Sequence, residues 1–222
     1  MIATLVGVGA LIGAGSAVAE TSTIGELALT PNGGLADTTG QNIPVFQGAA
    51  SANYVLSSPR SGTITSWSFL SGGIETGKQF VLRVLAPAGA AGTDWQAVST
   101  SSPVAVTSTT GADEVNGPFA ANLPIAAGDR IALQPIDGES TPIESGVIGQ
   151  DGIRFFMNPF PDGSTATQAG EEDNGQVVPI QATLTYAVPQ TEPPLTNPPA
   201  KNPRFPRSPA SRPRSSPRVP RP

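Results

Sequence analysis

Carboxylates are the side chains of this sequence with the greatest potential for chemistry. One of them, Asp129, stands between two apolar runs in "LPIAAGDRIALQP" at 123–135. The others that could form a site gather in three polar stretches: Asp113 and Glu114; Asp137, Glu139 and Glu144; Glu171, Glu172 and Asp173. Two carboxylates about 5–10 Å apart can hydrolyse a glycosidic bond, provided that aromatic side chains hold the sugar in a cleft. The chain has only two Trp and two Tyr, and both Trp fall in strand-like patterns, so we predict no catalytic residue.

The stretch "EEDNG" at 171–175 has the oxygen-rich composition of a calcium-binding loop. Its spacing does not match the EF-hand loop, and a calcium site without that loop gathers oxygen ligands from separate segments. Calcium binding and a solvated acidic loop both stay open, and we favour the solvated loop. We therefore expect no metal site and no cofactor.

The stretch "SGGIETGK" at 71–78 resembles a phosphate-binding loop, because Gly72, Gly77 and Lys78 follow the G-x-x-x-x-G-K spacing. The Walker motif continues with Ser or Thr and opens a helix. Gln79 replaces that hydroxyl here, and a strand-like run follows. We interpret the stretch as a hairpin loop whose glycines permit positive φ, and we expect no nucleotide binding.

The sequence contains no His and no Cys. Nucleophile systems of the Ser-His-Asp or Cys-His type cannot be built from this chain, and neither can disulfides or the usual zinc sites. Chemistry that uses carboxylates alone, and oxygen-ligated Ca²⁺, are not excluded by this composition.

The net charge of −5 hides an uneven distribution along the chain. The last 22 residues hold seven basic residues and no acid, namely Lys201, Arg204, Arg207, Arg212, Arg214, Arg218 and Arg221. The rest of the chain keeps 5 basic residues against all 17 acidic ones, a formal charge of −12. A nucleic-acid partner would need a basic face on this body, so we expect none.

The N-terminal segment "MIATLVGVGALIGAGSAVAE" has the apolar run and the Ala-Val-Ala ending of a secretory signal, although no Lys or Arg precedes Glu20. We predict cleavage after Ala19 and a secreted or cell-surface protein. An uncleaved anchor is the alternative, and it is disfavoured because the run is shorter than the ~20 residues that a span needs. We expect no membrane span after cleavage.

Residues 189–222 carry 12 of the 24 prolines. Proline lacks the N–H that helices and sheets need, and the segment has too few apolar residues for a core, so we predict a disordered tail. Two functions stay open for it: a solvated spacer, which we favour, and electrostatic contact with an anionic surface such as cell-wall polymer.

Period-two apolar patterns cover residues 43–188, whereas 20–42 lack a pattern and are interpreted as a flexible lead-in. The strongest expected strands are 62–70, 78–86 and 177–188; weaker ones lie near 43–48, 52–57, 94–99, 103–107, 129–135 and 151–157. The pattern in 62–70 places Thr63, Thr65, Trp67 and Phe69 on one face. Pro179 predicts that the last strand is an edge strand or is bulged.

Short strands separated by Gly and Pro predict one all-β domain, an antiparallel β-sandwich of jelly-roll type with disordered termini. No stretch after residue 20 keeps a helical period. The expected core residues are Trp67, Phe80, Leu82, Val84, Trp95, Ile131, Leu133, Phe155, Ile180, Leu184 and Tyr186.

Three motifs carry a resemblance to a known family. Gly62–Trp67 fits G-x-[VI]-[TV]-x-W, Leu82–Val84 fits L-R-V, and Leu123–Leu133 fits L-P-[VI]-x-A-G-D-x-[IV]-x-L. Over about 52–188 the chain resembles an uncharacterised exported β-sandwich (jelly-roll-like) domain of actinobacterial secreted proteins. The resemblance implies export and a sandwich fold, and it supplies no catalytic residue. The Gly-Asp hairpin is also similar to one in jelly rolls of the complement-C1q and tumour-necrosis-factor type, which are binding folds.

Asp129 follows a glycine, and its carboxylate can accept a hydrogen bond from a nearby backbone N–H, so we predict that it closes a hairpin. The expected function is a non-catalytic exported module with a binding or structural role outside the cell or at its surface. The alternative is a carbohydrate-binding module, with or without Ca²⁺. That alternative needs an exposed aromatic platform, so burial of both Trp67 and Trp95 would weigh against it.

Overall fold

The computed structural model of the chain is an all-β fold with two antiparallel sheets. It describes residues 17–27, 34–36, 41–48, 54–107, 114–143, 152–172 and 175–189. The expected signal segment up to residue 16 and the expected tail from residue 190 onward lie outside these described residues.

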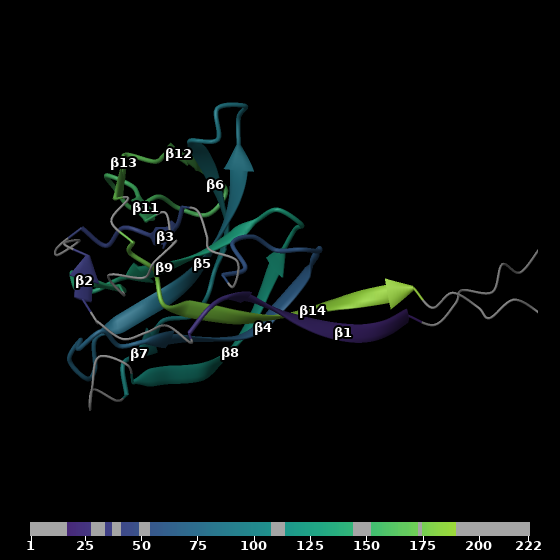
Figure 1. Cartoon of the computed structure of the whole chain (residues 1–222), viewed down its shortest axis with the longest axis horizontal. Coiled ribbons are helices and arrows are strands. Elements are labelled where there is room, and N and C mark those ends of the chain that lie inside the picture. The colour runs from purple at the N-terminus through teal and green to yellow at the C-terminus, as the bar shows by residue number, and fades with distance from the viewer. Residues whose placement is uncertain are drawn as a thin grey trace, which may run out of the picture. The chain divides into compact units, whose positions relative to one another are not determined.

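The first sheet contains the first and last strands of the chain, and we call it the terminal sheet. Its order is β1 (Ala17–Gly25), β14 (Ile180–Pro189), β4 (Gly62–Leu70) and β8 (Val115–Ile125). β1 and β14 pair along their whole length, from Ala17 opposite Pro189 to Gly25 opposite Gln181. Their outer halves run on as a two-stranded ribbon past the ends of β4 and β8 (Figure 1).

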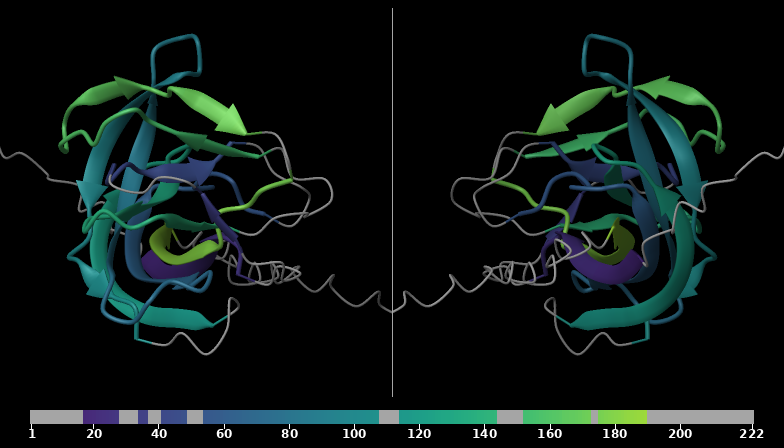
Figure 2. Two further views of the ribbon diagram at one scale, coloured as in Figure 1. Left: turned by 90° about the vertical axis from the view of Figure 1, so that its left-hand side faces the viewer. Right: turned by 90° about the vertical axis from the view of Figure 1, so that its right-hand side faces the viewer.

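The second sheet curls into a half-barrel, which Figure 2 shows in views from either side, and we call it the curled sheet. Its order is β12 (Thr165–Thr167), β6 (Asp94–Thr100), β5 (Gln79–Ala88), β9 (Arg130–Pro135), β3 (Val45–Gln47), β11 (Ile153–Phe155) and β13 (Gly170–Glu172), with β7 (Val104–Ala105) paired to β5. β10 (Thr141–Ile143) and β2 (Gly34–Ala36) form a separate pair.

The strand pairs are nested along the sequence. β5 pairs with β6, β4 with β8, β3 with β9 and β1 with β14, all antiparallel. Only the innermost of these pairs, β5 and β6, is joined by a short hairpin. The chain therefore passes from one sheet to the other between β3 and β4, β4 and β5, β7 and β8, β8 and β9, and β13 and β14.

The main hydrophobic core lies between the inner faces of the two sheets. Of the expected core residues, Trp67, Phe80, Leu82, Val84, Ile131, Leu133, Ile180 and Leu184 are buried in it, and Phe155 and Tyr186 pack against it partly buried. Trp95 is also buried, but in a second cluster on the other face of the curled sheet. Each fully buried aliphatic or aromatic side chain contributes about 1.5–3 kcal/mol to folding.

β4 departs from the strict alternation that its sequence suggests. The register against β14 shifts where Thr183 and Leu184 pair with Ser66 and Ile64, so Thr65 is an extra residue in β4. The bulge turns Ile64 and Trp67 toward the same side, and both are buried, whereas Thr65 is exposed. The expected shared face of Thr63, Thr65, Trp67 and Phe69 is therefore wrong, because a bulge reverses the alternation beyond it.

The N-terminal part of the fold also differs from expectation. Part of the segment 20–42, expected as a flexible lead-in, forms β1 and β2. Ile24 is fully buried in the main core, so β1 contributes to the hydrophobic core as well as to the sheet. Four consecutive polar residues, 20–23, precede Ile24 in β1, so the strand shows no period-two apolar pattern in the sequence.

The expectation about Pro179 needs correction. β14 begins at Ile180, directly after Pro179, and lies between β1 and β4, so it is neither an edge strand nor bulged at that proline. The Pro179 carbonyl instead accepts a hydrogen bond from the Leu70 N–H at 3.0 Å. β8 carries Pro118 and Pro124 and is an edge strand of the terminal sheet, the position where prolines are tolerated.

Candidate functional site

The Gly-Asp turn joins β8 to β9 and has the geometry of a closed turn. The Asp129 carboxylate accepts a hydrogen bond from the Ala126 N–H at 2.8 Å, and the Asp129 N–H donates to the Ala126 carbonyl at 3.2 Å. Gly128 has φ of 93°, a conformation that glycine adopts without strain. Ser58 fastens the turn, since it donates to the Asp129 carbonyl at 2.7 Å and accepts from Gly128 N–H at 2.8 Å.

The turn does not close a hairpin, which corrects that part of the sequence interpretation. β8 belongs to the terminal sheet and pairs with β4, whereas β9 belongs to the curled sheet and pairs with β5 and β3. The turn therefore carries the chain across the core from one sheet to the other. Leu123 and Ile125 on one side, and Ile131 and Leu133 on the other, enter the core from opposite sheets.

Asp129 has the environment of a structural carboxylate. Only 4% of the residue is exposed, and this burial raises the pKa of its carboxyl, while the hydrogen bond from Ala126 opposes the rise. The hydrogen-bond donor to the carboxylate is the backbone N–H of Ala126, in the same turn. These contacts explain Asp129 by turn chemistry alone.

The Gly-Lys stretch 71–78 is a crossing between the sheets, from β4 to β5, and not the hairpin loop expected from its glycines. Ile74 anchors it in the core at 3% exposure. Lys78 forms an ion pair with Glu139 at 2.9 Å, and the Asp137 carboxylate accepts from Gln79 N–H at 3.0 Å. A phosphate placed here would face these carboxylates, so the geometry disfavours nucleotide binding.

The remaining acidic candidates fall in different places. Asp113, Glu144 and Asp173 lie outside the described residues. Glu171 pairs with Arg154 in the backbone register of β13 against β11. Across the described residues, no three acidic side chains gather closely enough to hold a metal ion.

Both tryptophans are buried, Trp67 at 1% and Trp95 at 4% exposure. Trp67 stacks on Phe69, with ring centroids 5.6 Å apart, and Trp95 meets the edge of Phe46 at 4.8 Å. Neither ring can serve as a platform for sugar stacking. This burial removes the main support for a carbohydrate-binding module.

Two arginines that sequence reasoning did not single out are built into the second cluster. Arg83, on β5, is 4% exposed and donates hydrogen bonds to Gln134 Oε1 at 2.8 Å and to the Phe160 carbonyl at 2.9 Å. It also pairs with Asp162 at 3.1 Å, and its burial lowers the pKa of the guanidinium. Arg83 alternates with Leu82 and Val84 along β5 and so faces away from the main core, and the second cluster covers that face.

Arg130, on β9, plays a similar part at the other end of the second cluster. Its guanidinium lies 4.9 Å from the Trp95 ring centroid and donates to the Gly48 carbonyl at 2.7 Å and to the Gln47 carbonyl at 3.0 Å. Cation–π contact and carbonyl acceptors account for a half-buried positive charge. Arg83 therefore ties Phe160 and Asp162 to β5, and Arg130 ties the end of β3 to β9, which are structural roles.

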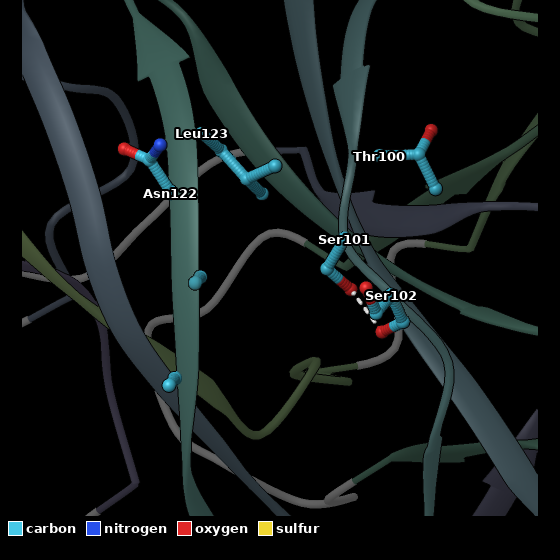
Figure 3. Close-up of a pocket in the computed structure, with 7 residues that line it drawn as sticks. Thr100, Ser101, Ser102, Asn122 and Leu123 are labelled. Atoms are coloured by element: carbon cyan, nitrogen blue, oxygen red, sulfur yellow. Dashed lines mark hydrogen bonds between the residues drawn. The ribbon is translucent and has the colours of Figure 1, made fainter.

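A cleft of about 370 Å³ opens where β8 faces the end of β6. Thr100, Ser101, Ser102, Ala120, Ala121, Asn122 and Leu123 line it. Figure 3 shows Leu123 pointing toward the serine side and Asn122 pointing away from it. The Ser101 hydroxyl accepts from Leu82 N–H at 2.9 Å and donates to the Ser102 carbonyl at 2.9 Å, so its hydrogen bonds are used within the fold. The lining has no charged side chain, and it offers no acid, base or nucleophile with an activating partner.

No protein family, curated protein or solved structure matches the chain. The resemblance to exported actinobacterial domains is therefore supported only at the level of an all-β protein with two antiparallel sheets. Within the described part of the chain, no helix is long and apolar enough to cross a bilayer.

Proposed function

We propose that the protein is an exported, non-catalytic β-sandwich module with a binding or structural role outside the cell or at its surface. The observation that carries the proposal is the position of β1. β1 runs from Ala17 to Gly25 and the expected cleavage follows Ala19, so the exported chain would begin inside β1 and would keep residues 20–25, with the buried Ile24, as its first strand. The lack of His and Cys in the sequence supports a non-catalytic role.

The proposed architecture is a jelly roll, in which two sheets form from a long chain hairpin wound around a core. The nested pairs support it, since strands far apart in sequence pair from the innermost, β5 with β6, to the outermost, β1 with β14. The four pairs alternate between the curled and the terminal sheet. A jelly roll is shared by proteins of many functions, so it supports the module and does not specify the ligand.

Export is tested by expressing the full chain in a bacterial host that secretes proteins and sequencing the N-terminus of the product. We expect the exported protein to begin at Glu20. Replacing both Ala17 and Ala19 by Asp should block processing, because signal peptidase reads small residues there. The matched control is Val18→Asp, between the two recognised positions, which should be processed. Retention of the wild-type chain inside the cell, or an intact N-terminus outside it, would contradict the proposal.

A further inference from the structure

The outward face of the terminal sheet carries no charge, although the body of the protein is strongly acidic. Among all residues of β1, β14, β4 and β8, Glu20 alone is charged. Glu20 shares the inward side of β1 with Ile24, four residues further on, so it does not belong to the outward face. The strands of the curled sheet, in contrast, include Arg83, Asp94 and Arg130.

Threonines form ordered rows across this uncharged surface, which we call the threonine face. Thr-x-Thr occurs on three neighbouring strands: Thr21 and Thr23 on β1, Thr183 and Thr185 on β14, Thr63 and Thr65 on β4. Thr21 is opposite Thr185, and Thr185 is opposite Thr63, so one row crosses all three strands. Thr23 and Thr183 begin a second row, which continues at Ser66 because of the β4 bulge.

We propose that the threonine face is the contact surface between two copies of this chain. Two bodies of formal charge −12 repel each other, and this repulsion opposes a contact least where the two surfaces lack carboxylates. The threonine face meets that condition. A strongly charged polymer, in contrast, finds no opposite charge on it.

The side chains of the threonine face can form hydrogen bonds with the same face of a second copy. Each threonine hydroxyl both donates and accepts a hydrogen bond, so identical faces are complementary without any change of side chain. The threonine methyl groups add apolar area, and β-branched side chains lose little rotamer freedom on contact. Two-fold symmetry brings the same patch of each copy together.

The size of the face is adequate for such a contact. Four strands spaced ~4.8 Å apart, each presenting about eight residues at ~3.3 Å per residue, give a planar area of roughly 500 Å². Side-chain relief increases the accessible area above this value. A standard interface buries about 800 Å² per partner and weak, transient ones bury less, so a reversible dimer would use the whole face.

The test is the mass of the full chain in solution, measured by sedimentation velocity over a concentration series. We expect a monomer–dimer equilibrium that strengthens when salt rises from about 0.1 M to about 1 M, because shortening the Debye length from ~10 Å to ~3 Å screens the repulsion between the acidic bodies. Thr65→Glu and Thr185→Glu should each weaken the dimer at least about tenfold, since like charges would meet in the contact. Thr165→Glu, the same change on exposed β12, is the control and should leave the dimer unchanged.

Three results would overturn the proposal. The first is a monomer at every concentration and salt. The second is a dimer that Thr65→Glu and Thr165→Glu weaken equally. The third is association that weakens with salt and disappears when the seven basic residues of 201–222 are replaced by Gln, which would assign it to contact between the tail and the acidic body. Circular dichroism of each variant separates loss of the dimer from loss of folding.

Discussion

Asp129 is a candidate site residue by its type in the sequence, and the fold gives it a structural role in a turn. Its carboxylate accepts from Ala126 N–H at 2.8 Å, and its own backbone carbonyl accepts from Ser58 N–H at 2.7 Å. Removing the carboxylate leaves the Ala126 N–H without its partner. Asp129→Ala should therefore lower the free energy of unfolding by about 1–2 kcal/mol and leave any binding activity of the folded protein intact. Chemical denaturation together with the binding assay checks this, and loss of binding at unchanged stability would contradict it.

The pKa of Asp129 predicts a specific pH dependence. Burial raises this pKa above its ordinary value, so the folded state holds the proton more tightly than the unfolded chain does. The stabilisation from this proton is complete below the unfolded value of about 3.9 and is lost as pH rises through the folded-state value. Asp129→Asn keeps the acceptor oxygen and cannot ionise. The variant should therefore gain stability relative to the wild type as pH rises from 3 to 7, and parallel pH profiles for the two proteins would contradict the prediction.

Arg83 should be the most sensitive charged residue of the fold. It is 4% exposed, and its replacement by Ala leaves Gln134 Oε1 and the Phe160 carbonyl without a donor. We expect Arg83→Ala to cost about 2–4 kcal/mol. Asp162→Ala is the matched control: the Asp162 side chain is 44% exposed, so solvent screens its ion pair and the cost should stay below about 1 kcal/mol. If thermal denaturation showed that Arg83→Ala and Asp162→Ala lower the free energy of unfolding equally, the ion pair would be the stabilising contact, and the buried hydrogen bonds would not.

At the scale of elements, β1 extends the β domain toward the N-terminus, because the sequence predicted that the domain begins at residue 43. Ile24 is fully buried, so Ile24→Ala should cost about 3 kcal/mol through lost burial and the cavity left behind. The neighbouring Thr23→Ala, on the exposed side of the same strand, should change stability by less than about 0.5 kcal/mol. Urea denaturation checks both variants. No effect of Ile24→Ala would mean that residues 20–25 are a lead-in after all.

The predicted elements succeeded where local signals are strong. The expected strands at 62–70, 78–86, 94–99 and 129–135 agree with β4, β5, β6 and β9. β8 was missed because Gly117, Pro118 and Pro124 interrupt its apolar alternation. Prolines of that kind are compatible with an edge strand, and edge position is a property of the sheet that the segment itself does not encode.

At the scale of the whole molecule, the basic segment 201–222 predicts adhesion to an anionic polymer. We expect the full chain to bind purified anionic cell wall at low salt, and to lose that binding when Lys201 and the six arginines are replaced by Gln. A variant with Lys in place of the six arginines is the control and should still bind, because the attraction depends on charge. Equal pull-down by the Gln variant and the wild type would leave the tail as a spacer.

The sequence by itself determined that this is a β protein. Alternation of apolar residues requires strands with one buried side, and the absence of His and Cys restricts the chemistry of any site. Turn chemistry also identified Asp129, because an Asp after Gly meets its backbone partner within four residues. These properties depend on interactions within a few positions of the chain.

Only the tertiary structure decided which strands are partners. "LPIAAGDRIALQP" reads equally as a hairpin or as a crossing, because inward-facing residues of two sheets have the same pattern as those of one. The fold sends β8 to the terminal sheet and β9 to the curled sheet. The same is true of Arg83, whose outward side chain became buried when the second cluster covered it. Alternation of apolar residues indicates which side chains of a strand are buried. The residues that bury them lie far away in the sequence, so only the fold shows which they are.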